Sequence, residues 1–262
     1  MISNVRAALK FLFFIVAILF YFAFTLPAFF LIRFAPFAIR KYLIVIMAIV
    51  IRSIMIVFNL KISYRGDVNE LKKSRSRLIV ANHMSYLDIL IMASQKPACF
   101  VTSVEVREMP FLGQLSLVGG CLYVERRNKE KIHEEVQQLE SALNSGLNIV
   151  IFPEATSTNG TEVLRFKRPL FNAAIKAKKD VLPLTINYVR INDTNVCINN
   201  RDLLCWYGDM EFLPHFWKFL KLKKVEVELT ISPVISSDNT DMTKLSELAH
   251  SIVSKDYRPI SC

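Results

Sequence analysis

The hydrophobic and polar positions of this chain divide it into two parts. Residues 11–32 carry no charge over 22 positions, and residues 43–60 carry only Arg52. An uncharged apolar run of about 20 residues is long enough to cross a lipid bilayer as a helix. The rest of the chain shows short apolar runs separated by polar loops. The pattern therefore predicts a membrane-associated helical segment, residues 1–60, followed by a second domain, residues 61–262.

The charges around the first segment bear on how it would meet a membrane. Basic residues stand on both sides of it, at Arg6, Lys10 and Arg33, so they favour neither direction of crossing. A charge at Arg52 is costly in hydrocarbon, so the second segment is expected to span poorly. We expect a membrane-embedded anchor or a hairpin lying in one leaflet, with both ends in the cytoplasm.

Two alternatives to this anchor stay open. A cleaved signal peptide is less favoured, because the apolar run is long and no cleavage site with small residues follows it. In the other alternative, the second segment is a helix of the folded domain, and Arg52 makes a basic contact there.

Residues 61–262 alternate between two kinds of apolar pattern. Short apolar or alternating runs predict strands within 63–76 and at 78–81, 98–105, 119–127, 147–154, 181–189 and 225–234. Apolar residues at helical spacing and suitable terminal residues predict helices at 88–93, 129–145, 168–179 and 242–253. This alternation predicts an α/β fold, with a mixed, mostly buried sheet and flanking helices.

Composition favours a lipid partner over other anionic partners. The chain has 52% hydrophobic residues, 19 Phe against 7 Gly, and a formal net charge of +10. A basic balance fits nucleic acid, anionic lipid headgroups or a phosphorylated substrate. No nucleic-acid-binding motif is present, so we expect no nucleic acid partner and favour lipids. The five cysteines include no CxxC pair, so neither a zinc site nor a disulfide framework is indicated.

His83 and Asp88 are the residues most suggestive of chemistry. His83 follows the predicted strand 78–81, and Asp88 stands five residues later, where the next helix is expected. In one interpretation His83 is an ordinary loop residue and Asp88 stabilises the helix N-terminus. In the other, His83 is a general base and Asp88 holds its ring. The chain has no GxSxG motif, and no cysteine is paired with a base, so His83 would activate an acceptor substrate directly.

Four sequence blocks in order resemble the glycerolipid acyltransferase family of the 1-acylglycerol-3-phosphate acyltransferase type. Residues 82–88, NHMSYLD, resemble its HxxxxD motif. Residues 119–126 resemble G-x-x-F-I-x-R, residues 151–160 resemble F-P-E-G-T-R-S, and residues 181–186 resemble V-x-P-x. The matching positions in these last three blocks are Gly120, Tyr123, Val124, Arg126, Phe152, Pro153, Glu154, Thr156, Val181 and Pro183.

This resemblance implies the transfer of a fatty acyl group from acyl-CoA or acyl-ACP to the free hydroxyl of a lysolipid. The first acceptor it suggests is 1-acylglycerol-3-phosphate, which would give phosphatidic acid in phospholipid biosynthesis. Together with the apolar N-terminal segments, it leads us to expect a membrane location with the catalytic domain facing the cytoplasm. Membrane lipids would be partners, and neither a cofactor nor a metal ion would be needed besides the acyl co-substrate.

Carried over to this chain, the resemblance makes His83 the general base and Asp88 its orienting partner. Arg126 would bind the phosphate of the acceptor, as the guanidinium geometry allows. The remaining expected substrate-binding residues are Asn82, Glu154, Thr156 and Lys167. Backbone amides and the Asn82 side chain are the candidate donors to the oxyanion.

Two departures from the family pattern concern the third block. Ala155 stands where the family has Gly, so a backbone with positive φ would be strained there. Ser157 stands where the family has Arg, which would leave phosphate binding to Arg126, Lys167 or Arg168. The acceptor could therefore be another lysolipid, such as lysophosphatidylcholine or lyso-ornithine lipid. A non-catalytic lipid-binding protein on the same fold is a further alternative.

An aromatic segment, residues 206–217, precedes a basic stretch at 218–224. Aromatic residues beside basic ones suit a membrane interface. A loop that packs into the core, followed by a solvated basic stretch, is the equally weighted alternative.

Overall fold

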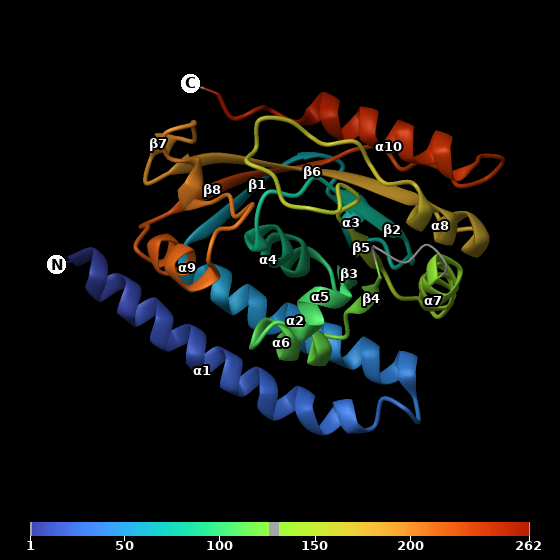
Figure 1. Ribbon diagram of the computed structural model, residues 1–262, viewed down its shortest axis with the longest axis horizontal. Coiled ribbons are helices and arrows are strands. Elements are labelled where there is room, and N and C mark those ends of the chain that lie inside the picture. Colours follow the sequence, from blue (N-terminus) through green and yellow to red (C-terminus); the bar gives the residue numbers. More distant parts are fainter. Residues whose placement is uncertain (1, 126–130, 262) are drawn as a thin grey trace.

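The computed structural model describes residues 2–125 and 131–261 (Figure 1). Its helices are α1 (Ile2–Phe30), α2 (Pro36–Phe58), α3 (Asn69–Lys72), α4 (Tyr86–Gln95), α5 (Val104–Glu108), α6 (Leu112–Val118), α7 (Ile132–Asn144), α8 (Asn172–Ala177), α9 (Phe212–Leu220) and α10 (Met242–Asp256), with 3₁₀ turns η2 (Pro169–Phe171) and η3 (Arg201–Leu203). Its strands are β1 (Leu60–Gly66), β2 (Leu78–Ala81), β3 (Cys99–Ser103), β4 (Leu122–Val124), β5 (Ile149–Ile151), β6 (Val181–Ile191), β7 (Thr194–Asn195) and β8 (Val225–Ile231).

The strands form one mixed sheet, which confirms the predicted α/β fold. Within the described residues its order is β1-β8-β6-β2-β5-β3-β4, and the short β7 pairs with β6. The pairs from β6 through β4 are parallel, whereas β8 runs antiparallel to β6. The predicted strand 78–81 matches β2 residue for residue.

Helices cover both faces of the sheet. Leu78 and Val80 of β2 join the core under α7, α8 and α10, whereas Ile79 and Ala81 join the core on the side of α4 and α2. Figure 1 shows α10 above the sheet and α4, α2 and α1 below it. Because both faces are covered, β2 reads as a continuous apolar run rather than an alternating one.

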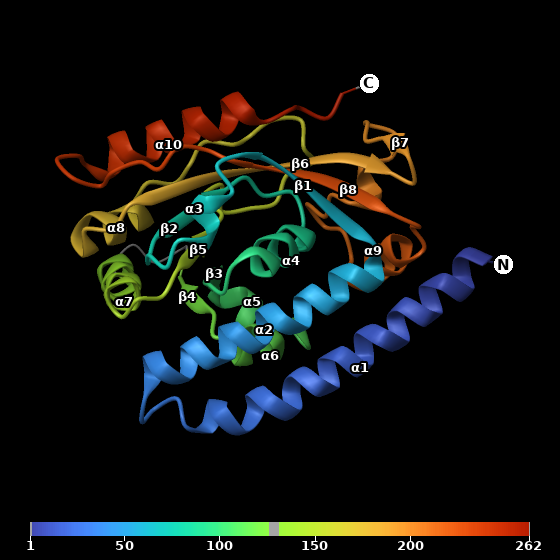
Figure 2. The same ribbon diagram turned by 180° about the vertical axis from the view of Figure 1, so that it is seen from behind.

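The two N-terminal helices form an antiparallel hairpin, with α2 between α1 and α4 in both views (Figures 1 and 2). Both helices are long and apolar enough to cross a membrane. Arg52 donates from Nε to Ser94 O at 2.7 Å and from a terminal nitrogen to Gln95 O at 3.4 Å. These carbonyls lie at the C-terminal end of α4, where helices leave such groups unpaired. The basic contact of Arg52 with the folded domain is therefore present.

The outer face of α1 is an exposed apolar stripe. Its inner face packs into the core through residues such as Ala7, Phe14 and Tyr21. The stripe, which follows helical spacing, consists of Ile2, Val5, Leu9, Leu12, Val16 and Leu19. No polar residue interrupts this set, which is unusual for a helix facing water.

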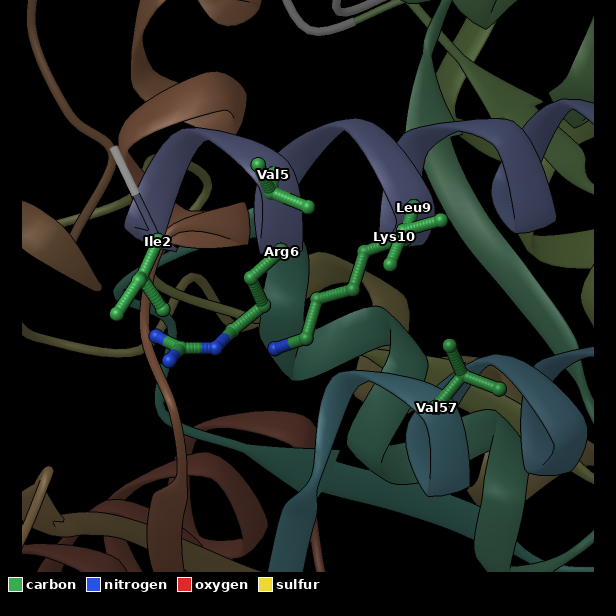
Figure 3. Close-up of a pocket in the computed structure, with 6 residues that line it drawn as sticks. All are labelled: Ile2, Val5, Arg6, Leu9, Lys10 and Val57. Atoms are coloured by element: carbon green, nitrogen blue, oxygen red, sulfur yellow. The ribbon is translucent and has the colours of Figure 1, made fainter.

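Arg6 and Lys10 fasten α1 to the ends of two other helices. Lys10 Nζ donates to Phe58 O at 3.0 Å and to Leu222 O at 2.8 Å, and Arg6 donates to Lys221 O at 2.9 Å. Both side chains leave α1 on the side of Val57 and line an open hollow of about 560 Å³ (Figure 3). Positive charge at these C-terminal ends is favourable against the helix dipoles of α2 and α9.

The aromatic segment 206–217 packs into the core, as one expectation had it, but its second half is a helix rather than a loop. The helix α9 begins at Phe212 and packs on α1, with ring centroids 4.9 Å apart for Phe14 and Phe216 and 6.1 Å apart for Phe11 and Trp217. Phe216 and Phe219 are buried at helical spacing. The segment is thus a packed helix that joins the N-terminal hairpin to the domain. The short helices α5 and α6 were also not predicted.

The contacts of Lys10 predict a measurable loss of stability on substitution. In Lys10→Met the two carbonyls lose a charged donor, so the free energy of unfolding should fall by about 1.5–3 kcal/mol. Lys41→Met is the matched control, since Lys41 is exposed on α2, and it should change stability by less than about 0.5 kcal/mol. Urea unfolding in detergent micelles measures both; equal effects would contradict the fastening role.

Candidate active site

Two loops at the same edge of the sheet build the site. The strands β2 and β5 are parallel neighbours, and Val80 pairs with Ile151. The loop with His83 follows β2, and the loop with Glu154 follows β5. Carboxyl ends of adjacent parallel strands open on a common crevice, where α/β proteins bind ligands.

His83 and Asp88 form a direct pair. The distance from His83 Nδ1 to Asp88 Oδ2 is 2.9 Å, the carboxylate is fully buried, and the imidazole is 19% exposed. Ser85 is the N-cap of α4 in an extended conformation, which makes Asp88 the third helical residue. The five-residue spacing thus brings a loop residue against the first turn of the helix. The carboxylate therefore contacts both the start of the helix and the histidine.

The hydrogen bonds of Asp88 fix the tautomer of His83. Besides the imidazole, Oδ2 accepts from Met84 N at 2.6 Å and from Ser85 N at 2.8 Å, and Oδ1 accepts from the Tyr188 hydroxyl at 2.6 Å. An ionised carboxylate only accepts hydrogen bonds, so Nδ1 must carry the proton. The other ring nitrogen, Nε2, then has a lone pair available to act as a base.

The loop after β5 holds His83 on three sides. The His83 ring stacks on Phe152, with centroids 4.2 Å apart and planes 16° apart. His83 N donates to Glu154 Oε1 at 2.7 Å. His83 O accepts from Thr158 N at 3.0 Å and from its hydroxyl at 3.3 Å. These contacts hold both the ring and the backbone of His83.

Glu154 is a buried brace between two stretches of backbone. Its Oε1 accepts from His83 N, its Oε2 accepts from Leu164 N at 2.8 Å, and it is 3% exposed. Burial raises the pKa of this carboxyl to about 7, against the two backbone N–H donors, which lower it. Glu154 therefore shapes the site through the loop that it holds.

The other expected substrate-binding residues differ in exposure. Asn82 is 1% exposed and bonds through both side-chain polar atoms to Ile186, with Nδ2 donating at 3.0 Å and Oδ1 accepting at 2.8 Å. It links β2 to β6, so this geometry does not agree with the expected oxyanion donor. Thr156 and Lys167 are exposed, and Lys167 N donates to Pro153 O at 2.8 Å, beside Glu154. Arg126 lies outside the described residues.

Sequence reasoning gave no role to Tyr188, to the Phe152 ring or to Thr158. Phe152 and Thr158 belong to the same sequence block as Glu154. Their contacts with His83 follow from the packing of this block against the block that contains His83. Tyr188 ends the apolar face of β6 that includes Leu184 and Ile186. A hydroxyl at the end of a buried apolar face needs a hydrogen-bond partner. This requirement is the feature of the sequence that could have pointed to Tyr188.

The backbone at Ala155 has φ 64°, the positive value that the family's Gly at this position suggested. An L-residue in this conformation costs about 1–2 kcal/mol. Ala155→Gly should therefore raise the free energy of unfolding by about 0.5–1 kcal/mol, after the extra entropy of the unfolded Gly chain is subtracted. Urea unfolding measures this, with Ala142→Gly in α7 as a control that should lose at least about 1 kcal/mol, because Ala142 is both helical and buried. A loss at both positions would contradict strain at Ala155.

The raised pKa of Glu154 predicts how stability depends on pH. The pKa is about 7 in the folded chain against an ordinary value of 4.5, so the folded state keeps a proton that the unfolded state has lost. The free energy of unfolding should fall, by up to about 3 kcal/mol, as pH rises from 4.5 through 7. Glu154→Gln cannot ionise and should lack this share of the slope, whereas Glu134→Gln, at an exposed position, should keep it. Parallel slopes in all three proteins, measured by urea unfolding from pH 4.5 to 8, would exclude this assignment.

Comparisons with known proteins show relatives of this chain. The family model described as Acyltransferase matches residues 62–187, a range that contains the four sequence blocks. A lyso-ornithine lipid O-acyltransferase of Brucella abortus is 30% identical over 187 residues, or 68% of this chain and 70% of that protein. A 1-acyl-sn-glycerol-3-phosphate acyltransferase of Neisseria gonorrhoeae is 27% identical over 184 residues, with shares of 68% and 70%.

A solved structure shares the fold. The crystal structure of the 1-acyl-sn-glycerophosphate acyltransferase PlsC from Thermotoga maritima has a TM-score of 0.66, covers 97% of this chain and 95% of its own, and is 20% identical. The Brucella relative, 30% identical with 70% of its length covered, decides the family. This chain belongs to the acyltransferase family.

Proposed function

We propose that this chain is a lysolipid O-acyltransferase. It moves a fatty acyl group from the thioester of acyl-CoA or acyl-ACP to the free hydroxyl of a lysolipid. The observation that supports this most is the His83–Asp88 pair, in which His83 Nδ1 lies 2.9 Å from Asp88 Oδ2. A base of this kind suits a hydroxyl acceptor, and it argues against a non-catalytic lipid-binding protein.

In the proposed reaction, Nε2 of His83 takes the proton of the acceptor hydroxyl as its oxygen attacks the thioester carbonyl carbon. Asp88 Oδ2 stabilises the imidazolium that forms. When the tetrahedral intermediate collapses, the carbon–sulfur bond breaks and the imidazolium returns its proton to the leaving thiolate. A new ester and a free thiol result, and this sequence uses no cofactor or metal ion.

The acceptor that we propose first is 1-acylglycerol-3-phosphate, which gives phosphatidic acid in phospholipid biosynthesis. The Neisseria relative carries this acceptor in its name. Arg126 is the proposed phosphate ligand, since a guanidinium matches phosphate oxygens, and Lys167 is exposed beside the loop of Glu154. Thr156, exposed on that loop, would face the same headgroup.

A second acceptor, lyso-ornithine lipid, has support of its own. Ser157 replaces the arginine of the family pattern, which removes one cation that would suit a phosphate. The Brucella relative carries the lyso-ornithine acceptor in its name. The reaction and the base are the same for both acceptors, so only the headgroup contacts differ.

We also propose that residues 1–60 anchor the enzyme to a membrane, with the α/β domain of residues 61–262 on the cytoplasmic side. The exposed apolar stripe of α1 supports this, because large apolar surface patches are rare on soluble monomers. Arg52 lies against α4 rather than free in the apolar segment. This favours a hairpin resting in one leaflet, with membrane lipids as its partners.

A transfer assay in detergent micelles tests the proposed function. Purified protein receives radiolabelled acyl-CoA, or acyl-ACP in a second series, together with 1-acylglycerol-3-phosphate, lyso-ornithine lipid or lysophosphatidylcholine. Labelled phosphatidic acid is the expected product. His83→Ala should lower the rate by about 10²–10⁴-fold.

The controls separate loss of chemistry from loss of fold. His133 is exposed on α7, so His133→Ala should keep the wild-type rate. The His83→Ala protein should unfold near the wild-type temperature. Product with lyso-ornithine lipid alone would replace the acceptor and keep the reaction, whereas no product with any donor and acceptor would overturn the proposed function.

A further inference from the structure

The two oxygens of Asp88 have different partners. Oδ2 meets His83 Nδ1 at 2.9 Å and two backbone N–H groups, whereas Oδ1 accepts from the Tyr188 hydroxyl at 2.6 Å. Asp88 is fully buried and Tyr188 is 7% exposed. Outside its own loop and helix, Asp88 is therefore held by the phenol of Tyr188.

Tyr188 reaches Asp88 from the far end of β6. Leu184, Ile186 and Tyr188 lie on the sheet face that packs toward α4. The pairing of β6 with β8 shifts register between Tyr188 and Arg190. Such irregularities re-aim side chains beside active sites. The Asn82 side chain, just after β2, bonds to the backbone of Ile186 in β6, two residues before Tyr188. The start of the His83 loop and the Tyr188 phenol are therefore positioned by the same strand, β6.

The direction of the Tyr188 hydrogen bond is fixed by its surroundings. Burial and the neighbouring Asp88 charge hold the pKa of Tyr188 well above its usual range. The phenol therefore keeps its proton, and Asp88 accepts. A hydrogen bond from a neutral donor to a buried carboxylate spreads the negative charge of the carboxylate.

We infer that Tyr188 is a positioning residue of the catalytic pair, which rests on the role of His83 in the proposed function. Its hydroxyl occupies Oδ1 of Asp88, so Oδ2 alone faces His83, and it draws part of the negative charge away from the imidazole. Without the hydroxyl, Asp88 should stabilise the imidazolium more strongly. The pKa of His83 should then rise.

Other titratable groups also surround the pair. They come from the loop after β5, from α4, from the segment before α9 and from the segment after α10, and they are Glu154, Tyr86, Cys205 and Tyr257. The Tyr257 hydroxyl donates to Gly160 O at 2.6 Å, and the Tyr86 hydroxyl pairs with His215 Nδ1 at 3.0 Å. A change confined to the Tyr188 oxygen leaves these groups in place.

The test compares Tyr188→Phe with Tyr86→Phe in the full chain. Both variants remove one buried phenol oxygen near α4, but only the first oxygen bonds to Asp88. Histidine NMR titration in detergent micelles reports the pKa of His83, whose signal is identified by its absence in His83→Ala. The expected result is a raised His83 pKa in Tyr188→Phe and the wild-type value in Tyr86→Phe. An unchanged or lowered His83 pKa in Tyr188→Phe would overturn the inference.

A second substitution should shift the pKa of His83 in the opposite direction. A 3-fluorotyrosine placed at position 188 has a more acidic phenol and is a stronger donor, so the pKa of His83 should fall. This replacement keeps the hydrogen bond and the fold even where Tyr188→Phe is unstable. A His83 pKa that does not fall would contradict the inference.

Kinetics supply an independent readout. In Tyr188→Phe the acidic limb of the pH profile of kcat/KM should move to higher pH, because His83 must be neutral to act as a base. KM for the acceptor should stay within about twofold, since Tyr188 bonds to the Asp88 oxygen that faces away from His83. The NMR titration needs no turnover. It decides the role of Tyr188 even where no acceptor is acylated, a result that would overturn the proposed function alone.

Discussion

The architecture of the site depends on one buried carboxylate. Asp88 is fully buried, and removing an ion of this kind from water costs several kcal/mol unless hydrogen bonds compensate. The chain supplies donors from three sources: two amides of the β2–α4 turn, the phenol of β6 and the imidazole of His83. The hydrogen bonds to this carboxylate therefore fix three features together: the start of α4, the distance between α4 and β6, and the tautomer of the histidine.

The loop after β5 also holds His83, through contacts that Asp88 does not make. Glu154 and Thr158 bond to the backbone N–H and C=O of His83, and Phe152 covers its ring. These contacts cross from β5 to β2, which are parallel neighbours. The first and third sequence blocks thus form one unit, and the strained φ of Ala155 lies between its two bracing residues. Strain at such positions persists only where the surroundings over-determine the backbone.

The sequence alone indicated those parts of the molecule that depend on local pattern. The strand 78–81 followed from its apolar run, and the pairing of His83 with Asp88 was one of two interpretations of a strand end followed by a helix start. The packing of α9 against α1 did not follow, because its aromatic face is buried by a helix about 200 residues away in sequence. Tyr188 was missed for the same reason: it lies 100 positions after Asp88, and only the register of β6 beside β2 brings them together.

Helix α4 connects the N-terminal hairpin to the catalytic pair. At its first turn Asp88 accepts the bonds that fix His83, and at its last turn Ser94 and Gln95 accept from Arg52 of α2. The helix has 10 residues, and short helices draw most of their stability from tertiary packing rather than from propensity. In α4 a carboxylate bonds at the N-terminus and a guanidinium bonds at the C-terminus. The helix dipole favours both charges at these ends. Displacing the hairpin would release the guanidinium end, so the position of Asp88 depends on the hairpin as well as on the sheet.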